Sequence, residues 1–442
     1  MRPPDAGRYR LVRTRVPAVL VDGAPDTARR DRDDLLHLDL AIADGHVAGL
    51  YPAGSSDPAL GPAIDLDGGQ VWPCFVDMHT HLDKGHIWPR AANPDGSFMG
   101  ALNTVRADRD ANWEEADVRR RMDFALRCAL AHGTRAIRTH LDSAPPRGLS
   151  NWAVFKAMKR EWAGRIELQG VALMPVDTYA EHAYIERLAD AVADAGGMLG
   201  GATHFSVTGN PVPLIDRAAA VARDRGLGLD FHVDETLDPS ILTIEPVARA
   251  VMREKISGPV VCGHCCVLSV QPEPVLDRVL GLARDANLAV VSLPMCNMYL
   301  QDRGPAGRTP RRRGTTALHE LKRAGIPLAL ASDNTRDPFY AYGDLDMLEV
   351  FQQAVRIGQL DHPIGEWPAA VTRIPADLMG LPQAGRIAAG LPADLVLFRG
   401  RAYSELLSRR QAERVVLHRG RAIDAVPPDY RELDDLFGRT PP

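Results

Sequence analysis

Short apolar runs alternate with amphipathic stretches through the middle of the chain. Eight of these runs have the length and the β-branched content of buried strands: residues 71–76, 134–140, 166–174, 198–204, 227–233, 259–265, 289–294 and 326–332. Apolar residues recur every three or four positions in the stretches 113–132, 152–162, 180–195, 215–225, 246–255, 274–286, 316–324 and 343–356, which indicates helices. This alternation predicts an α/β fold, a TIM (β/α)8 barrel.

The two ends of the chain follow another pattern. Residues 8–72 show the period-2 alternation of strands, and residues 383–425 contain short apolar runs separated by glycine. We therefore expect a small β-sandwich domain formed from residues 1–72 and 383–442, beside a barrel domain of residues 73–382. The last residues, 427–442, are polar and contain proline, which predicts a loosely held tail.

Composition narrows the class of protein. The chain has 442 residues, 45% of them hydrophobic, enough for one large barrel with an appendage. A net charge of −5 gives no reason to expect nucleic acid or a membrane surface as a partner. The sequence shows neither a secretory signal nor an apolar run of roughly 20 residues. The six cysteines show no paired framework, so we expect a cytoplasmic protein.

Polar residues with metal-binding chemistry stand where several predicted strands end. His79 and His81 are two residues apart at the end of the first strand, so their side chains point to the same face. The fifth strand ends in His232, the sixth in His264 and the eighth in Asp333. Active sites of barrel enzymes lie at this end of the strands. Zinc and ferrous iron both accept imidazole and carboxylate ligands, so the pattern predicts a catalytic metal site.

Several motifs resemble those of the amidohydrolase superfamily, and most closely its cytosine deaminase-like branch. They are FVDMHTHLDKG at 75–85, RTHLD at 138–142, HVDE at 232–235, CGH at 262–264, ASDN at 331–334 and GRIAAGLPADLVLF at 385–398. The resemblance covers nearly the whole chain. It implies that His79, His81, His232 and Asp333 bind the metal, with Asp333 also serving in catalysis. It implies that Glu235 is the acid/base group and that His264 orients the hydrolytic water or the tetrahedral centre.

The resemblance also implies one divalent metal ion per chain, Zn²⁺ or alternatively Fe²⁺. Binuclear members of the superfamily place a bridging lysine on the fourth strand, and the corresponding MLGGATHF at 198–205 has none. Two departures from cytosine deaminases remove polar substrate contacts: Pro175 stands where they have glutamine, and Asn334 where they have a second aspartate. A site built to hydrogen-bond one ring discriminates against another, so cytosine is not the expected substrate.

These inferences predict a metal-dependent deaminase that releases ammonia from a small nitrogen heterocycle, such as a pyrimidine, pterin or triazine. One alternative is hydrolysis of a cyclic amide or a substituted C–N bond at the same metal site, and a minor one is a non-catalytic, dihydropyrimidinase-like scaffold. We expect substrate contacts from Lys84, Trp88, Asn334 and Phe339, although Trp88 and Phe339 are equally compatible with plain packing. A small-molecule heterocyclic substrate and a homo-oligomer are the expected partners.

Overall fold

The computed structural model describes residues 7–204, 206–304, 308–411 and 413–438. The chain forms two compact units: residues 1–77, 128–136 and 346–427 make up the first, and residues 78–127, 137–345 and 428–442 the second. The predicted domain division at 72/73 and 382/383 stays a prediction, because compactness alone does not define a segment that folds by itself. Within the described ranges, no helix is both long and apolar enough to cross a bilayer.

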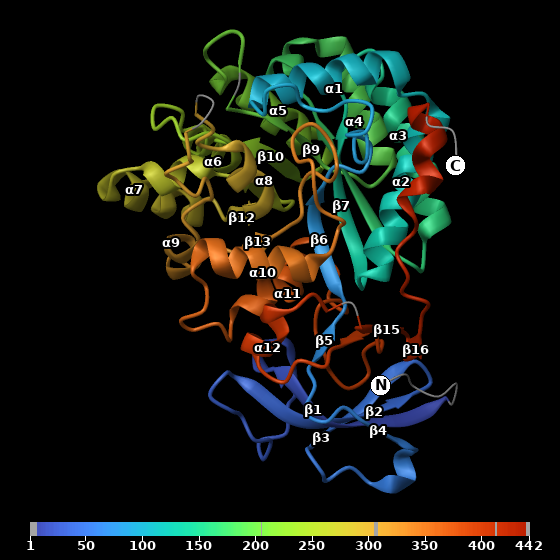
Figure 1. Cartoon of the computed structure of the whole chain (residues 1–442). Coiled ribbons are helices and arrows are strands. Elements are labelled where there is room, and N and C mark those ends of the chain that lie inside the picture. Colours follow the sequence, from blue (N-terminus) through green and yellow to red (C-terminus); the bar gives the residue numbers. More distant parts are fainter. Residues whose placement is uncertain (1–6, 205, 305–307, 412, 439–442) are drawn as a thin grey trace. The chain divides into compact units, whose positions relative to one another are not determined.

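The first unit contains two four-stranded sheets (Figure 1). One has the order β3-β2-β1-β4, from β1 (Arg8–Pro17), β2 (Leu35–Ala43), β3 (His46–Pro52) and β4 (Ala63–Asp65). The other has the order β16-β15-β14-β5, from β5 (Val71–Pro73), β14 (Leu395–Leu397), β15 (Val415–His418) and β16 (Arg421–Ala422). Alternate residues of both sheets, including Leu38, Leu40, Leu395 and Leu417, pack in one buried hydrophobic cluster. The two ends of the chain therefore share a core.

Short helices complete the first unit. They are α10 (Met347–Gly358), α11 (Arg373–Leu378) and α12 (Tyr403–Ser408), with the 3-10 turns η1 (Ala18–Leu20), η2 (Pro58–Leu60) and η5 (Trp367–Val371). Helix α10 corresponds to the helix predicted at 343–356 after the eighth strand, and its buried face includes Leu348, Phe351 and Val355. This apolar spacing is what predicted a helix there.

Parallel strands form the framework of the second unit. The sheet β6-β7-β8 contains β6 (Phe75–Thr80), β7 (Thr134–Asp142) and β8 (Glu167–Leu173); the first residues of β6 and β7 belong to the first unit. The sheet β9 to β13 contains β9 (Leu199–Ala202), β10 (Leu229–Val233), β11 (Val260–His264), β12 (Ala289–Ser292) and β13 (Leu328–Leu330), all paired in parallel. Parallel bridges join the two sheets on both sides, Val171 with Met198 and Thr80 with Asp333. An α/β fold with parallel strands is thus present.

Helices follow most of these strands. They are α1 (Phe98–Asn112), α2 (Glu115–Ala131), α3 (Gly148–Trp162), α4 (His182–Asp194), α5 (Val212–Arg225), α6 (Ile244–Glu254), α7 (Glu273–Asp285), α8 (Pro294–Leu300) and α9 (Leu318–Arg323), with the 3-10 turns η3 (Val176–Ala180), η4 (Cys266–Val270) and η6 (Tyr430–Phe437). The sequence pattern predicted α2 to α7 and α9 to within a few residues. It did not predict α1 and α8.

The end of the chain differs from the prediction. Residues 428–438 are not a loose tail, because η6 is held by charged and polar contacts. Arg120 donates to Asp435 at 2.9 Å, Arg127 donates to Glu432 at 2.7 Å, and the hydroxyl of Tyr430 donates to Asp344 at 2.7 Å. Residues 439–442 lie outside the described ranges.

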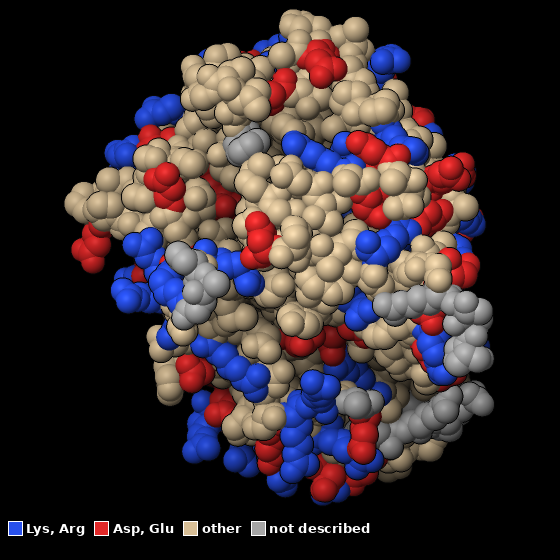
Figure 2. All heavy atoms as spheres, turned by 45° about the horizontal axis from the view of Figure 1, so that its top comes forward, with Lys and Arg blue, Asp and Glu red and all other residues tan. Residues whose placement is uncertain are grey.

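Surface charges of both signs are interspersed over the face shown in Figure 2. Many exposed charges form ion pairs, such as Arg225 with Glu186 at 2.6 Å and Arg223 with Asp224 at 2.7 Å. Exposed pairs of this kind contribute only about 0–1 kcal/mol each. The buried apolar strands and helix faces, not the surface charges, therefore carry the stability of the fold.

Candidate active site

Three strands of the second unit bring four of the predicted ligands together. His79 lies on β6, His81 directly follows it, His232 lies on β10, and Asp333 follows β13. The Nε2 atom of His81 is 3.1 Å from Asp333 Oδ1 and 3.3 Å from His232 Nε2, while His79 Nε2 is 3.7 Å from Asp333 Oδ1. The backbone N–H of Asp333 donates to the carbonyl of His79 at 2.9 Å, which fixes the two segments together. The four side chains thus converge on one buried point.

The chemistry of this cluster fits a divalent metal ion. Burial, followed by the neighbouring positive groups, lowers the pKa of His79 and of His232 well below its ordinary value. Both imidazoles are therefore neutral at pH 7, which is the form that binds metals. Neither ring nitrogen of His79 makes a hydrogen bond with any described residue. Buried nitrogens without partners are costly, and an ion bound by them removes that cost.

A second buried layer supports His79. The ring of His140, on β7, lies 3.9 Å from that of His79 between centroids, and its Nε2 is 3.7 Å from Oδ1 of Asp230. Asp230 accepts a hydrogen bond from Arg138 at 3.0 Å. Burial raises the pKa of Asp230 to about 7, although Arg138 opposes the shift. His79, His140 and Asp230 are also close enough to form a ligand group of their own.

Sequence analysis did not select His140 or Asp230 as site residues. His140 ends the strand predicted at 134–140 and belongs to the RTHLD motif, but the family resemblance assigned no role to it or to Asp230. A signal was available, because Asp230 is two residues before His232 and therefore points to the same face of β10.

Glu235 and His264 lie beside the ligand cluster. The Glu235 Oε1 atom is 3.5 Å from His264 Nδ1, and both side chains are buried. The amide of Asn297, on α8, donates to His264 Nδ1 at 3.0 Å, which leaves the proton of this imidazole on Nε2. Burial, and then the charge of Asp333, raise the pKa of Glu235 well above its ordinary value, and Lys84 opposes the shift.

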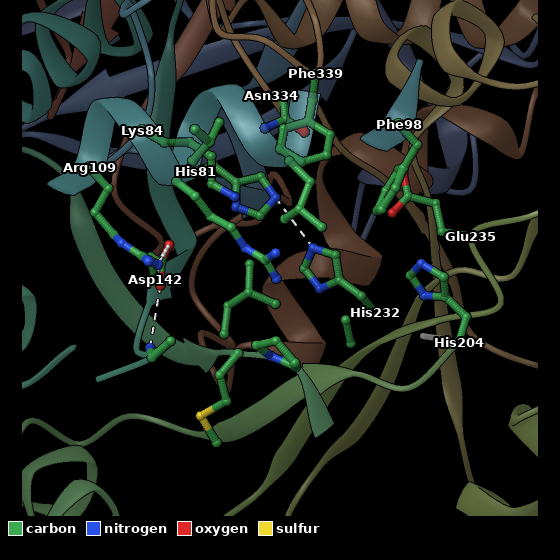
Figure 3. A pocket seen from close by; sticks show the side chains of 18 of the residues that line it. His81, Lys84, Phe98, Arg109, Asp142, His204, His232, Glu235, Asn334 and Phe339 are labelled. Carbon is green, nitrogen blue, oxygen red and sulfur yellow. Dashed lines mark hydrogen bonds and ion pairs between the residues drawn. The ribbon is translucent and has the colours of Figure 1, made fainter. Parts of the chain in front are cut away.

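A cavity of about 250 Å³ opens onto this cluster (Figure 3). The predicted metal ligands His81 and His232, together with Glu235 and His264, form part of its wall. Of the predicted substrate contacts, Lys84, Asn334 and Phe339 line it. Trp88 is not among the described residues that line the cavity, and a substrate contact from it stays a prediction.

Aromatic and polar groups shape the remaining wall. Phe98 and Phe339 meet edge to face with centroids 5.4 Å apart, and the ammonium of Lys84 lies 5.3 Å from the Phe339 ring. Asn334 donates to Asp337 at 2.7 Å, and Pro175, predicted in place of a glutamine, also lines the cavity. Two aromatic rings beside these polar groups suit a flat heterocycle that carries hydrogen-bonding atoms.

One face of helix α1 closes the cavity, and sequence analysis missed it. Its residues Phe98, Leu102, Val105, Arg106 and Arg109 line the wall at the spacing of successive helical turns. The N-cap Ser97 and this apolar spacing were the available signals. They are weak because the segment contains Gly100 and several charged residues.

Comparisons with known proteins show what the whole chain is similar to. The amidohydrolase family profile matches residues 182–423. A pterin deaminase from Rhizobium rhizogenes is 52% identical over 440 residues, which cover 99% of both chains. An N-isopropylammelide isopropyl amidohydrolase from a Pseudomonas species is 23% identical over 81% of this chain and 87% of its own.

Among solved structures, 5-methylcytosine deaminase from Klebsiella pneumoniae superposes with a TM-score of 0.80. It is 24% identical, over 94% of this chain and 97% of its own, and so it supports the fold alone. The family profile covers more than half of the chain, and the Rhizobium relative extends the similarity to nearly all of it. The chain therefore belongs to the amidohydrolase family.

Proposed function

We propose that this protein is a metal-dependent hydrolase that deaminates a pterin ring and releases ammonia. The observation that carries the proposal is the 52% identity to a pterin deaminase over 99% of both chains. The cavity supports it, because Phe98 and Phe339, in edge-to-face contact, form an aromatic part of the wall against which a flat bicyclic ring can pack, while Glu235 and His264 line the same space. A pterin carries its amino group on a carbon between two ring nitrogens, and it is one of the small nitrogen heterocycles that the sequence analysis predicted.

The reaction replaces that amino group with the oxygen of water. A metal ion held by His79, His81, His232 and Asp333 would supply a water whose pKa is lowered to about 7. The water oxygen bonds to the amino-bearing carbon, and Glu235 gives a proton to the adjacent ring nitrogen. The Nε2–H of His264 donates to the oxygen as negative charge develops on it. The carboxylate of Glu235 then takes the proton of the newly added hydroxyl group and passes it to the amino group, the C–N bond breaks, and ammonia leaves as the C=O bond forms.

For the metal we propose a single zinc ion, with ferrous iron as the alternative, held by His79, His81, His232 and Asp333. The donor set supports this choice, because three neutral imidazoles and one carboxylate match the preferences of both ions. Strand β9 reads LGGA and so offers no lysine for a bridge between two ions.

For the fold we propose that β6 to β13 close into one eight-stranded barrel. The bridges Thr80–Asp333 and Val171–Met198 support closure, because each joins one edge of the first parallel sheet to an edge of the second. We propose equally that the two sheets of the first unit form a β-sandwich, on the ground that they share one hydrophobic cluster.

A second candidate is hydrolysis of a substituted amine or a cyclic amide. The similarity to N-isopropylammelide isopropyl amidohydrolase favours it, since that relative aligns with 81% of this chain. The products separate the two reactions: the first releases ammonia, and the second releases an alkylamine or opens a ring.

A substrate panel tests the proposal. Zinc-loaded protein is incubated with pterin, cytosine, aminated triazines and N-alkylated triazines, and ammonia and amine are measured separately. We expect ammonia from pterin, with kcat/KM at least about tenfold above that for cytosine, because Pro175 cannot provide the hydrogen bond of a glutamine. Cytosine as the best substrate, or amine release without ammonia, would refute the assignment.

A further inference from the structure

Helix α1 places two arginines on the cavity wall, and their surroundings differ. Arg109 is ion-paired: its guanidinium donates to Asp142 at 3.0 Å and to Asp110 at 3.2 Å. Arg106 lies one turn earlier and is half-buried. No hydrogen bond or ion pair joins it to any residue in the described ranges. The cavity therefore has one guanidinium whose charge the protein does not neutralise.

The carboxylates of the cavity wall do not neutralise the positive charge of Arg106. Asp142 is bound by Arg109, and Glu235 contacts His264 and Asn297, both at 3.5 Å. Lys84 adds a second positive charge; it is 6% exposed and approaches the face of Phe339. The charge that faces a ligand in this space is thus positive. A half-buried guanidinium that no described protein group binds is hydrated, and it is available to an anionic ligand.

The chemistry of arginine narrows what that partner is. Its planar fork of N–H groups matches a carboxylate with two parallel hydrogen bonds, whereas a neutral ring offers it single acceptors. The helix presents Arg106 beside the apolar residues Leu102 and Val105, so a flat ring and an anionic substituent are accommodated side by side.

We propose that Arg106 binds a carboxylate carried by the ring substrate, so that carboxylated pterins are preferred over the unsubstituted ring. This inference rests on the proposed function for the identity of the ring. Arg106 is then a specificity-determining residue, separate from the groups that carry out the hydrolysis.

The test compares two ligands on three proteins. Zinc-loaded wild type, Arg106→Gln and Arg160→Gln are assayed for ammonia release from pterin and from pterin-6-carboxylate. Arg160 is a matched control, because it is an exposed arginine of the same unit on α3 and does not line the cavity. In the wild type, we expect kcat/KM for pterin-6-carboxylate to be about tenfold or more above kcat/KM for pterin. In Arg106→Gln, we expect this ratio of the two kcat/KM values to fall by a factor of about 10 to 100, the scale of a charge-assisted hydrogen bond. Arg160→Gln should keep the wild-type ratio.

A binding measurement separates this inference from the proposed function. The intrinsic fluorescence of both pterins is titrated with the same three proteins, which gives dissociation constants without turnover. If the wild type releases no ammonia but binds the carboxylate more tightly in an Arg106-dependent way, the deaminase assignment fails and the inference stands. An unchanged ratio in Arg106→Gln, an equal loss for both ligands, or no binding of either ligand would overturn the inference.

Discussion

The location of the Glu235 side chain indicates that it donates a proton and does not bind the metal. Its side chain is 7% exposed and lies beside His264, yet it is not among the groups that converge on the ligand cluster of His79, His81 and His232. Burial favours its protonated form, so the group is ready to donate a proton to a ring nitrogen. A neutral amide of the same shape cannot do this.

We predict that Glu235→Gln retains the metal content and the fold while kcat falls by roughly 10²-fold or more, the scale of a lost general acid/base. Metal analysis and steady-state kinetics on pterin check this together, with the exposed Glu273→Gln as control. Near-normal turnover of metal-loaded Glu235→Gln would remove the residue from the mechanism. A proportionate loss of metal would instead make it a ligand.

His140 acts, in our interpretation, through His79 and not on substrate. Its ring packs 3.9 Å from that of His79 while its Nε2 faces Asp230, an arrangement that holds a metal-binding imidazole in one orientation. We predict that His140→Phe, which keeps the ring packing but removes the polar contact, weakens zinc affinity by about 10- to 100-fold. Competition with a coloured chelator measures the affinity, and circular dichroism checks the fold. The exposed His182→Phe serves as control, and equal affinity in the two variants would contradict a positioning role.

At the scale of elements, helix α1 links stability to substrate binding. The Ser97 hydroxyl accepts a hydrogen bond from the N–H of Gly100 at 2.9 Å and so caps the helix that forms one cavity wall. We predict that Ser97→Ala costs about 1 kcal/mol of local stability. Because only the folded helix binds substrate, KM for pterin should rise up to about fivefold with little change in kcat.

The matched control is Ser150→Ala on α3, whose hydroxyl donates to a carbonyl and lies away from the cavity. Steady-state kinetics and limited proteolysis near α1 report the two effects. Equal KM values for the two variants would show that capping of α1 does not influence the site.

Elements with a strong periodic signal were predicted and those without it were not. The strands of the second unit are continuous buried apolar runs, so their existence and order were accessible from sequence. Helix α8 was missed because it begins at Pro294, two residues after β12 ends, and its buried Met295 and Cys296 extend the apolar run of that strand. The turn η6 was missed because ion pairs to α2, which leave no periodic pattern, hold it in place.

At the scale of the whole molecule, the metal site depends on the complete chain order. Its predicted ligands come from positions 79, 81, 232 and 333, which are brought together only when β6, β10 and β13 occupy one parallel framework. The strand ends were predictable one by one, and the spacing of Asp230 from His232 was a further signal, but the contacts of His140 with His79 and Asp230 depend on how the strands are arranged in space. A cytoplasmic location and a homo-oligomeric assembly stay predictions.

Metal content and the stability of the folded chain should depend on each other. Because the ligand set exists only in the folded chain, bound metal stabilises the native state by mass action, about 2.7 kcal/mol when free metal is 100 times its dissociation constant. We expect about one equivalent of zinc or iron per chain by elemental analysis. Chelation should lower the thermal unfolding midpoint, and added zinc should restore it. His232→Ala should lose both the metal and the zinc-dependent shift, whereas the exposed His182→Ala should keep both. Two tightly bound ions per chain would contradict the single-ion site, and the grouping of His79, His140 and Asp230 would permit a second ion. A thermal unfolding midpoint that chelation leaves unchanged would also contradict it.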